Sequence, residues 1–120
     1  MRVKYEVMVN EFERVLKKYG FNEKNAKDAA QIFAQNSLAG VYSHGLNRFP
    51  RVIEYLQKGE IDPQVTADCV LSMGAFERWD GHRGFGPLNA KQAMDRAVEL
   101  AKQYGITRTV IVNALSLIHI

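Results

Sequence analysis

Three side chains that could carry out chemistry, Ser43, His44 and Arg48, lie within six consecutive positions of this 120-residue chain. An imidazole can donate or accept a proton near neutral pH. A guanidinium can hold a planar carboxylate through two parallel hydrogen bonds. This combination could therefore bind a 2-oxo acid and protonate its carbonyl oxygen. No other segment of the sequence combines residue types of comparable reactivity.

A helix predicted over residues 45–56 would position these side chains. On that helix His44 and Arg48, four positions apart, would point to one side and lie at the N-terminal end, where the helix dipole favours an anion. The apolar residues at helical spacing that would face a core are Phe49, Val52, Ile53 and Leu56. The spacing also fits a surface helix with a histidine near its cap and a solvated arginine, because short motifs match often by chance.

The run Gly40-Val-Tyr-Ser-His-Gly-Leu-Asn-Arg-Phe-Pro50 resembles the signature near the N-terminus of the type 2 malate/L-lactate dehydrogenase family. The similarity extends over nearly the whole chain. Its further segments are Met73-Gly74-Ala75, Trp79-Asp80, the helical stretch 90–101 and Val112-Asn113-Ala114.

The resemblance implies a role for each of the three residues. The histidine matching His44 is the proton donor in that family, the arginine matching Arg48 binds the substrate carboxylate, and the serine matching Ser43 lies beside them. The implied reaction is reduction of a 2-oxo acid by NADH, with NADPH possible. The implied substrate is 2,3-diketo-L-gulonate first, with malate, lactate and ureidoglycolate as alternatives. The family is typically homodimeric and does not use the Rossmann fold.

Family members are roughly two to three times longer, in keeping with an additional cofactor domain. We therefore expect an N-terminal fragment that is inactive by itself, with most cofactor-binding residues outside it. The expected division is a helical segment carrying the motif (1–60), the start of an α/β domain (61–114) and a non-native tail (115–120). The tail, with His119, reads like a translated transposon end used in preparing sequencing libraries; a genuine strand continuation is the alternative.

Composition narrows the possible functions. The formal net charge is +3, from 16 basic and 13 acidic residues, and the basic residues do not gather with aromatic ones as in nucleic-acid readers. No apolar run is long enough to span a membrane and no signal peptide is recognisable, so we expect a cytoplasmic protein. The single cysteine, Cys69, excludes an internal disulfide, and no metal-ligand spacing is present. We expect Cys69 to be a small core side chain.

Hydrophobic periodicity predicts an α/β fold, in which a three-helix segment precedes a small α/β layer. The expected helices cover residues 5–19, 23–38 (capped by Asn22), 45–59 and 87–104. The expected strands cover residues 66–73, 76–80 and 107–113. Such a chain could also be a non-catalytic binding module, which is the alternative to the enzyme.

The loop Gly81–Gly86 precedes the last helix and contains His82 and Arg83. Glycine amides at a helix start can cradle a phosphate or carboxylate, but the spacing is not the dinucleotide-binding fingerprint. A flexible turn is the alternative. We expect His82 to be a solvated loop histidine whose charged form is disfavoured by the neighbouring Arg83.

Overall fold

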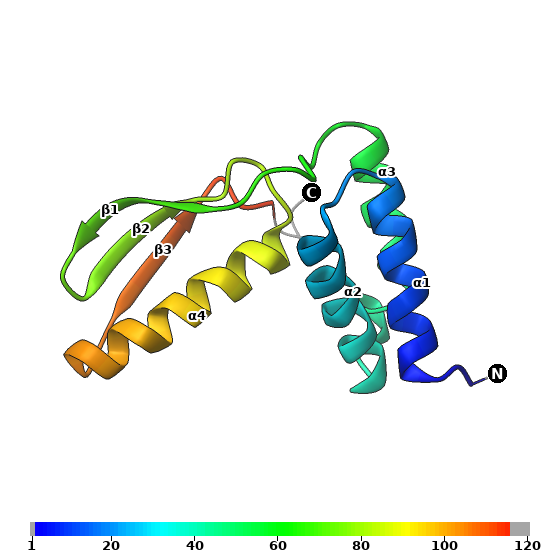
Figure 1. Ribbon diagram of the computed structural model, residues 1–120, viewed down its shortest axis with the longest axis horizontal. Coiled ribbons are helices and arrows are strands. Elements are labelled where there is room, and N and C mark those ends of the chain that lie inside the picture. Colours follow the sequence, from blue (N-terminus) through cyan, green and yellow to red (C-terminus); the bar gives the residue numbers. More distant parts are fainter. Residues whose placement is uncertain (1, 116–120) are drawn as a thin grey trace. The chain divides into compact units, whose positions relative to one another are not determined.

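The computed structural model describes residues 2–115 and divides after Gln64 into two compact units (Figure 1). The first unit contains α1 (Tyr5–Lys18), α2 (Glu23–Leu38), the 3-10 helix η1 (Tyr42–His44) and α3 (Phe49–Gln57). The second contains β1 (Asp68–Met73), β2 (Phe76–Asp80), α4 (Gly86–Tyr104) and β3 (Arg108–Val112). The predicted α/β class is confirmed. The tail predicted to be non-native lies, except for Leu115, outside the described residues.

The core of the helical unit is built around three phenylalanines, one from each α-helix. Phe12 of α1 stacks on Phe49 of α3 with ring centroids 4.3 Å apart, and Phe33 of α2 meets Phe49 edge to face at 5.2 Å. All three side chains are buried. Asn22 caps α2 as predicted, since its side chain accepts a hydrogen bond from the Asn25 amide at 2.8 Å. The contacts of Phe49 with Phe12 and Phe33 fix the start of α3 against the two longer helices.

The prediction of a helix beginning at Gly45 was wrong. A short 3-10 turn ends at His44, the backbone of Gly45 (φ −105°, ψ −127°) leaves helical geometry, and α3 begins only at Phe49. Pro50 occupies the first turn of α3, where its missing N–H costs nothing. His44 and Arg48 therefore do not share one face of an α-helix.

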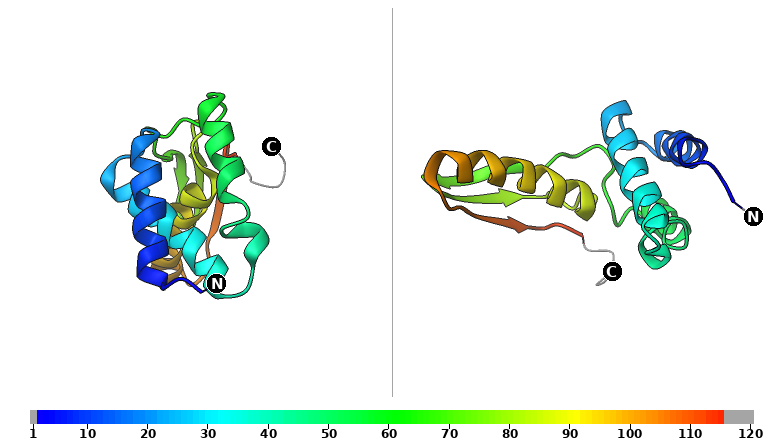
Figure 2. Two further views of the ribbon diagram at one scale, coloured as in Figure 1. Left: turned by 90° about the vertical axis from the view of Figure 1, so that its right-hand side faces the viewer. Right: turned by 90° about the horizontal axis from the view of Figure 1, so that it is seen from below.

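The second unit is a three-stranded sheet in the order β1-β2-β3 (Figure 1). Strands β1 and β2 form an antiparallel hairpin, whereas β2 and β3 are parallel and joined by α4, which lies along one face of the sheet (Figure 2). The start of β3 is fixed to the hairpin turn, because the Thr107 hydroxyl and the Arg108 amide both donate to the Ala75 carbonyl, at 2.8 and 2.9 Å. This strand–helix–strand crossover is the local α/β layer that the periodicity predicted.

The prediction that Cys69 belongs to the core was wrong. Cys69 is exposed, as is every residue of β1, so neither face of this strand is covered. A bulge between Cys69 and Leu71 interrupts the pairing with β2, and the Cys69 thiol donates to the Leu71 carbonyl at 3.3 Å. Alternation in a sequence indicates a strand, but it does not indicate whether the strand is covered.

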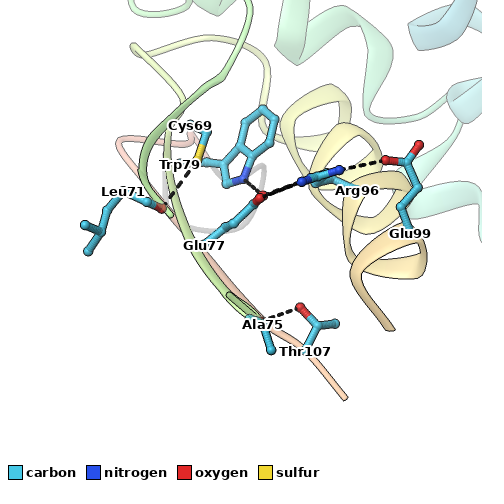
Figure 3. A network of polar contacts seen from close by, with 8 residues as sticks. All are labelled: Cys69, Leu71, Ala75, Glu77, Trp79, Arg96, Glu99 and Thr107. Carbon is cyan, nitrogen blue, oxygen red and sulfur yellow. Dashed lines mark hydrogen bonds and ion pairs between the residues drawn. The ribbon is translucent and has the colours of Figure 1, made fainter. Parts of the chain in front are cut away.

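A buried carboxylate joins the sheet to α4 (Figure 3). Glu77 of β2 is only 3% exposed and accepts hydrogen bonds from Arg96 of α4, at 2.9 Å from Nη2 and 3.1 Å from Nε, and from the Trp79 indole at 3.0 Å. Arg96 also contacts Glu99, at 3.0 Å. The hydrogen bonds from Arg96 are the main reason why the pKa of Glu77 lies below its ordinary value, despite the burial. The charge of Glu77 is thus satisfied inside the unit.

We predict that Arg96→Leu lowers the melting temperature clearly, whereas Arg14→Leu, which breaks the exposed pair with Glu11, changes it little. Because the folded-state pKa of Glu77 is depressed, the contribution of the pair is complete above the ordinary carboxylate pKa and is lost as the pH falls through the folded value. The difference in melting temperature between wild type and Arg96→Leu should therefore become smaller as the pH is lowered. Thermal unfolding followed by circular dichroism measures both effects. Equal losses of melting temperature in Arg96→Leu and Arg14→Leu would contradict the stabilising role of the Glu77–Arg96 pair.

Candidate active site

The segment that carries Ser43 and His44 lies against the C-terminal end of α2. The Asn36 side-chain amide donates to the His44 carbonyl at 3.0 Å, and the Ser37 hydroxyl accepts from the Leu46 amide at 2.8 Å. These two contacts cross from α2 to residues on either side of Gly45. The position of His44 is therefore set by a helix that lies earlier in the chain.

Gly45 permits this close approach. The residue is buried, and a Cβ atom placed on it would lie 2.1 Å from the Ser37 hydroxyl, 2.8 Å from the Ser37 nitrogen and 3.1 Å from the Phe33 carbonyl. Two of these three atoms are backbone and cannot rotate away. A side chain at position 45 would push the His44 segment off α2.

Ser43, His44 and Arg48, predicted from their spacing, are brought together in the structure. The Ser43 hydroxyl lies 3.0 Å from Nδ1 of His44, and Nε of Arg48 donates to the Ser43 carbonyl at 3.1 Å. Ser43 thus contacts both other residues. Within the described residues Nε2 of His44 has no hydrogen-bond partner, so Nδ1 orients the ring and Nε2 is the nitrogen available for proton transfer.

Arg48 is the residue immediately before α3, so its cation lies at the N-terminal end of that helix. The first amides of α3 are bonded within the chain or, at Pro50, absent, so the positive charge here is that of the guanidinium itself. Both Arg48 and His44 are only partly exposed. The arrangement favours an anionic group next to the imidazole.

Large apolar side chains are exposed next to this site. Tyr42 is 61% exposed, and three further residues of the same stretch are exposed to comparable extents: Leu38, Val41 and Leu46. A contiguous exposed apolar patch on a soluble protein commonly marks a surface that another body covers.

The loop Gly81–Gly84 holds the second histidine motif, and the prediction for its charge was wrong. His82 does lie in a loop and its side chain is 43% exposed, but Nε2 hydrogen-bonds Asp68 and Nδ1 lies 3.6 Å from Asp80. The hydrogen bond to Asp68 is the main cause that raises the pKa of His82 above its ordinary value, so the charged form is favoured. The sequence shows that Arg83 is adjacent to His82. It does not show that folding brings Asp68 and Asp80 close to the imidazole.

The backbone amides of this loop are already used within the chain. Gly81 donates to Val112, His82 to the Asp80 carboxylate, Arg83 to Asn113 and Gly84 to Gly81, at 2.8–2.9 Å. The Gly86 amide donates to the Leu115 carbonyl at 3.2 Å. These bonds support the interpretation of Gly81–Gly86 as a turn into α4 over that of a phosphate cradle.

The described part of the chain has neither a cluster of metal-ligating side chains nor a helix suited to span a membrane. Residues 2–115 contain no group of three His, Cys, Asp or Glu side chains placed to hold a metal ion. None of the helices in this range is long and apolar enough to cross a membrane.

Comparison with known proteins gives consistent results. The model of the family described as malate/L-lactate dehydrogenase matches residues 3–117. The chain is 48% identical over 114 residues to the 2,3-diketo-L-gulonate reductase of Pasteurella multocida and 46% identical to that of Haemophilus influenzae. Each alignment covers 95% of this chain but 34% of the relative, so the chain spans about a third of the length of these proteins.

Solved structures agree with the fold. Malate dehydrogenase from Entamoeba histolytica superposes with a TM-score of 0.93 at 30% identity, covering 98% of this chain and 33% of that one. Sulfolactate dehydrogenase from Methanocaldococcus jannaschii gives a TM-score of 0.92 at 35% identity, covering 98% and 34%. The expected dehydrogenase-like fold is confirmed.

We predict that the His82 imidazole titrates above its ordinary pKa and that Asp68→Asn lowers that pKa, whereas Asp95→Asn, which breaks the exposed Lys91 pair, leaves it unchanged. Since the folded-state pKa is raised, the stabilisation from this contact is complete below the ordinary histidine pKa and is lost as the pH rises through the folded value. Asp68→Asn should thus destabilise the chain more in mildly acidic than in alkaline buffer. The measurement is an NMR titration of the imidazole signals. A His82 pKa at its ordinary value would contradict the prediction.

Proposed function

Because the chain belongs to the malate/L-lactate dehydrogenase family, we propose that Ser43, His44 and Arg48 act in the reduction of a 2-oxo acid to the 2-hydroxy acid. The contact of all three residues through Ser43 is the observation that carries this proposal. The foremost substrate is 2,3-diketo-L-gulonate, which is named in relatives 45–48% identical to the chain. The alternatives are the 2-oxo acids whose reduction gives malate, lactate or ureidoglycolate.

Arg48 binds the substrate carboxylate in this proposal. Its Nε bond to the Ser43 carbonyl fixes the guanidinium next to His44. A carboxylate bound by Arg48 places the adjacent keto group next to the imidazole. Substrate binding therefore also orients the reacting carbonyl.

His44 donates the proton. As hydride reaches the carbonyl carbon, negative charge develops on the carbonyl oxygen, and protonated His44 transfers its proton from Nε2 to that oxygen. The product is the neutral hydroxyl of the 2-hydroxy acid. Ser43, through Nδ1, keeps the ring oriented during this transfer.

The hydride comes from a nicotinamide cofactor, NADH or alternatively NADPH, when it is bound. The Gly81–Gly86 turn does not fit a pyrophosphate group, since its amides named above are bonded within the chain. We propose that the cofactor is held by residues outside this chain. The 120-residue chain alone should then be inactive.

We further propose that the complete protein is a cytoplasmic homodimer. The exposed apolar residues beside His44, among them Tyr42 and Leu46, support a covering surface provided by the remaining polypeptide or a second subunit. The alternative function, a non-catalytic binding module, would need only that apolar surface. It would give no reason for an imidazole and a guanidinium to converge on one serine.

We predict that His44→Asn in the complete protein lowers kcat by about 10²- to 10⁴-fold, the usual contribution of general acid catalysis. Asparagine keeps polarity and approximate size but cannot donate a titratable proton. His82→Asn is the matched control, because His82 belongs to the other unit and to no part of the proposed mechanism. Steady-state reduction of 2,3-diketo-L-gulonate, oxaloacetate and pyruvate is the assay. Full activity of His44→Asn would rule out the assignment.

We predict that Arg48→Lys mainly raises KM, by about 10- to 100-fold, which corresponds to the loss of a charge-assisted hydrogen bond or two. Lysine keeps the charge but lacks the planar fork and the Nε donor to Ser43. Arg51→Lys, on the exposed side of α3, is the control. An unchanged KM and kcat for every 2-oxo acid tested would refute the role of Arg48.

A further inference from the structure

The last turn of α2 contacts the His44 segment through two side chains whose roles the motif does not include. Asn36 donates to the carbonyl of His44 itself at 3.0 Å, and Ser37 accepts from the Leu46 amide at 2.8 Å. The two bonds straddle Gly45. A third contact, from the Val41 amide to the Asn36 carbonyl at 2.8 Å, holds the other end of the same segment.

These side chains are not needed to end the helix. Backbone groups complete the C-terminus of α2, since the Ala39 amide donates to Gln35 and the Gly40 amide to Ser37. Gly40, with φ +85°, supplies the left-handed residue that commonly terminates a helix. A serine near a helix end usually bonds within its own turn or to water, whereas Ser37 bonds a residue nine positions later.

The two catalytic side chains are anchored differently. His44 is the last residue of the short η1 helix, which is attached to α2 by the contacts just described. Arg48 directly precedes Phe49, which is packed between Phe12 and Phe33 in the core. Loosening of the α2 contacts would therefore displace the imidazole more than the guanidinium.

We propose that Asn36 and Ser37 are positioning residues that hold His44 at the distance and angle needed for proton transfer, an inference that rests on the proposed function. Neither side chain touches substrate in this arrangement. Both act on the backbone on either side of Gly45. Only glycine at this position lets the segment approach Ser37 so closely. Misplacement of a catalytic group by about 1 Å can cost about 10²-fold in rate.

The test uses Asn36→Leu, Ser37→Ala and the double variant in the complete protein. Each single change should lower kcat about tenfold and the double about 10²-fold, with a smaller rise in KM, because α3 still anchors the backbone of Arg48 although its side chain bonds the Ser43 carbonyl. Leucine and alanine favour helices, so the fold should persist. Ser37→Thr keeps the hydroxyl and should therefore have the kcat of the wild type. Gln35→Ala, in the same helical turn, is the control.

A second readout does not depend on activity. Hydrogen exchange at the Leu46 amide should become about fivefold faster in Ser37→Ala than in Gln35→Ala, the effect expected for losing one hydrogen bond. Wild-type kcat in the double variant, or unchanged exchange at Leu46, would overturn the inference. Parallel losses of kcat, KM and melting temperature would also overturn it, since they would show general destabilisation.

The two proposals can fail separately. If His44→Asn keeps full activity, the assigned proton donor is wrong, whatever Leu46 exchange shows. If His44→Asn is inactive while Ser37→Ala and Asn36→Leu behave like wild type, the proposed function stands and the positioning role is refuted.

Discussion

The absence of a side chain at Gly45 is the constraint on which the candidate site depends. Because a Cβ atom there would overlap Ser37, only glycine lets the segment after η1 lie against α2. That contact brings Asn36 and Ser37 within hydrogen-bonding distance of backbone groups on either side of Gly45. The orientation of His44 thus follows from a packing condition between two segments that are not adjacent in the chain. The glycine of a motif can therefore be as specific a requirement as its histidine.

The α/β unit depends on a contact of a different kind. Glu77 is buried on the sheet face covered by α4, and a buried charge without a partner would destabilise the unit strongly. Arg96 and Trp79 satisfy it from α4 and from β2 itself. In both units, polar contacts between different elements, eight or nine positions apart in the first and 19 in the second, fix a relative position that hydrophobic burial alone leaves open. Burial favours many relative positions of two elements, whereas a directional bond selects one.

Much of the fold could be predicted from the sequence, because helical and strand periodicities are local. The Asn22 cap, the ends of α2 and α4 and the β1–β2 hairpin all follow from patterns a few residues long. Long-range effects escaped prediction. α3 starts at Phe49 and not at Gly45 because the segment before it packs against α2. Cys69 is exposed because neither face of β1 is covered, and the charged form of His82 is favoured because its imidazole hydrogen-bonds Asp68. The motif identified Ser43, His44 and Arg48, but gave no sign of Asn36 or Ser37.

The break in the helix also has a chemical consequence. On a continuous helix His44 and Arg48 would be stacked one turn apart, and each side chain would be free to choose its rotamer. In the loop, the Ser43 residue lies between them, with its hydroxyl on the imidazole and its carbonyl on the guanidinium. One residue thereby sets the direction of both functional groups. Substitutions in α2 that move Ser43 should then affect the imidazole and, through the Ser43 carbonyl, the guanidinium as well. One residue in a turn between two packed helices can in this way couple two side chains that a helical face would leave independent.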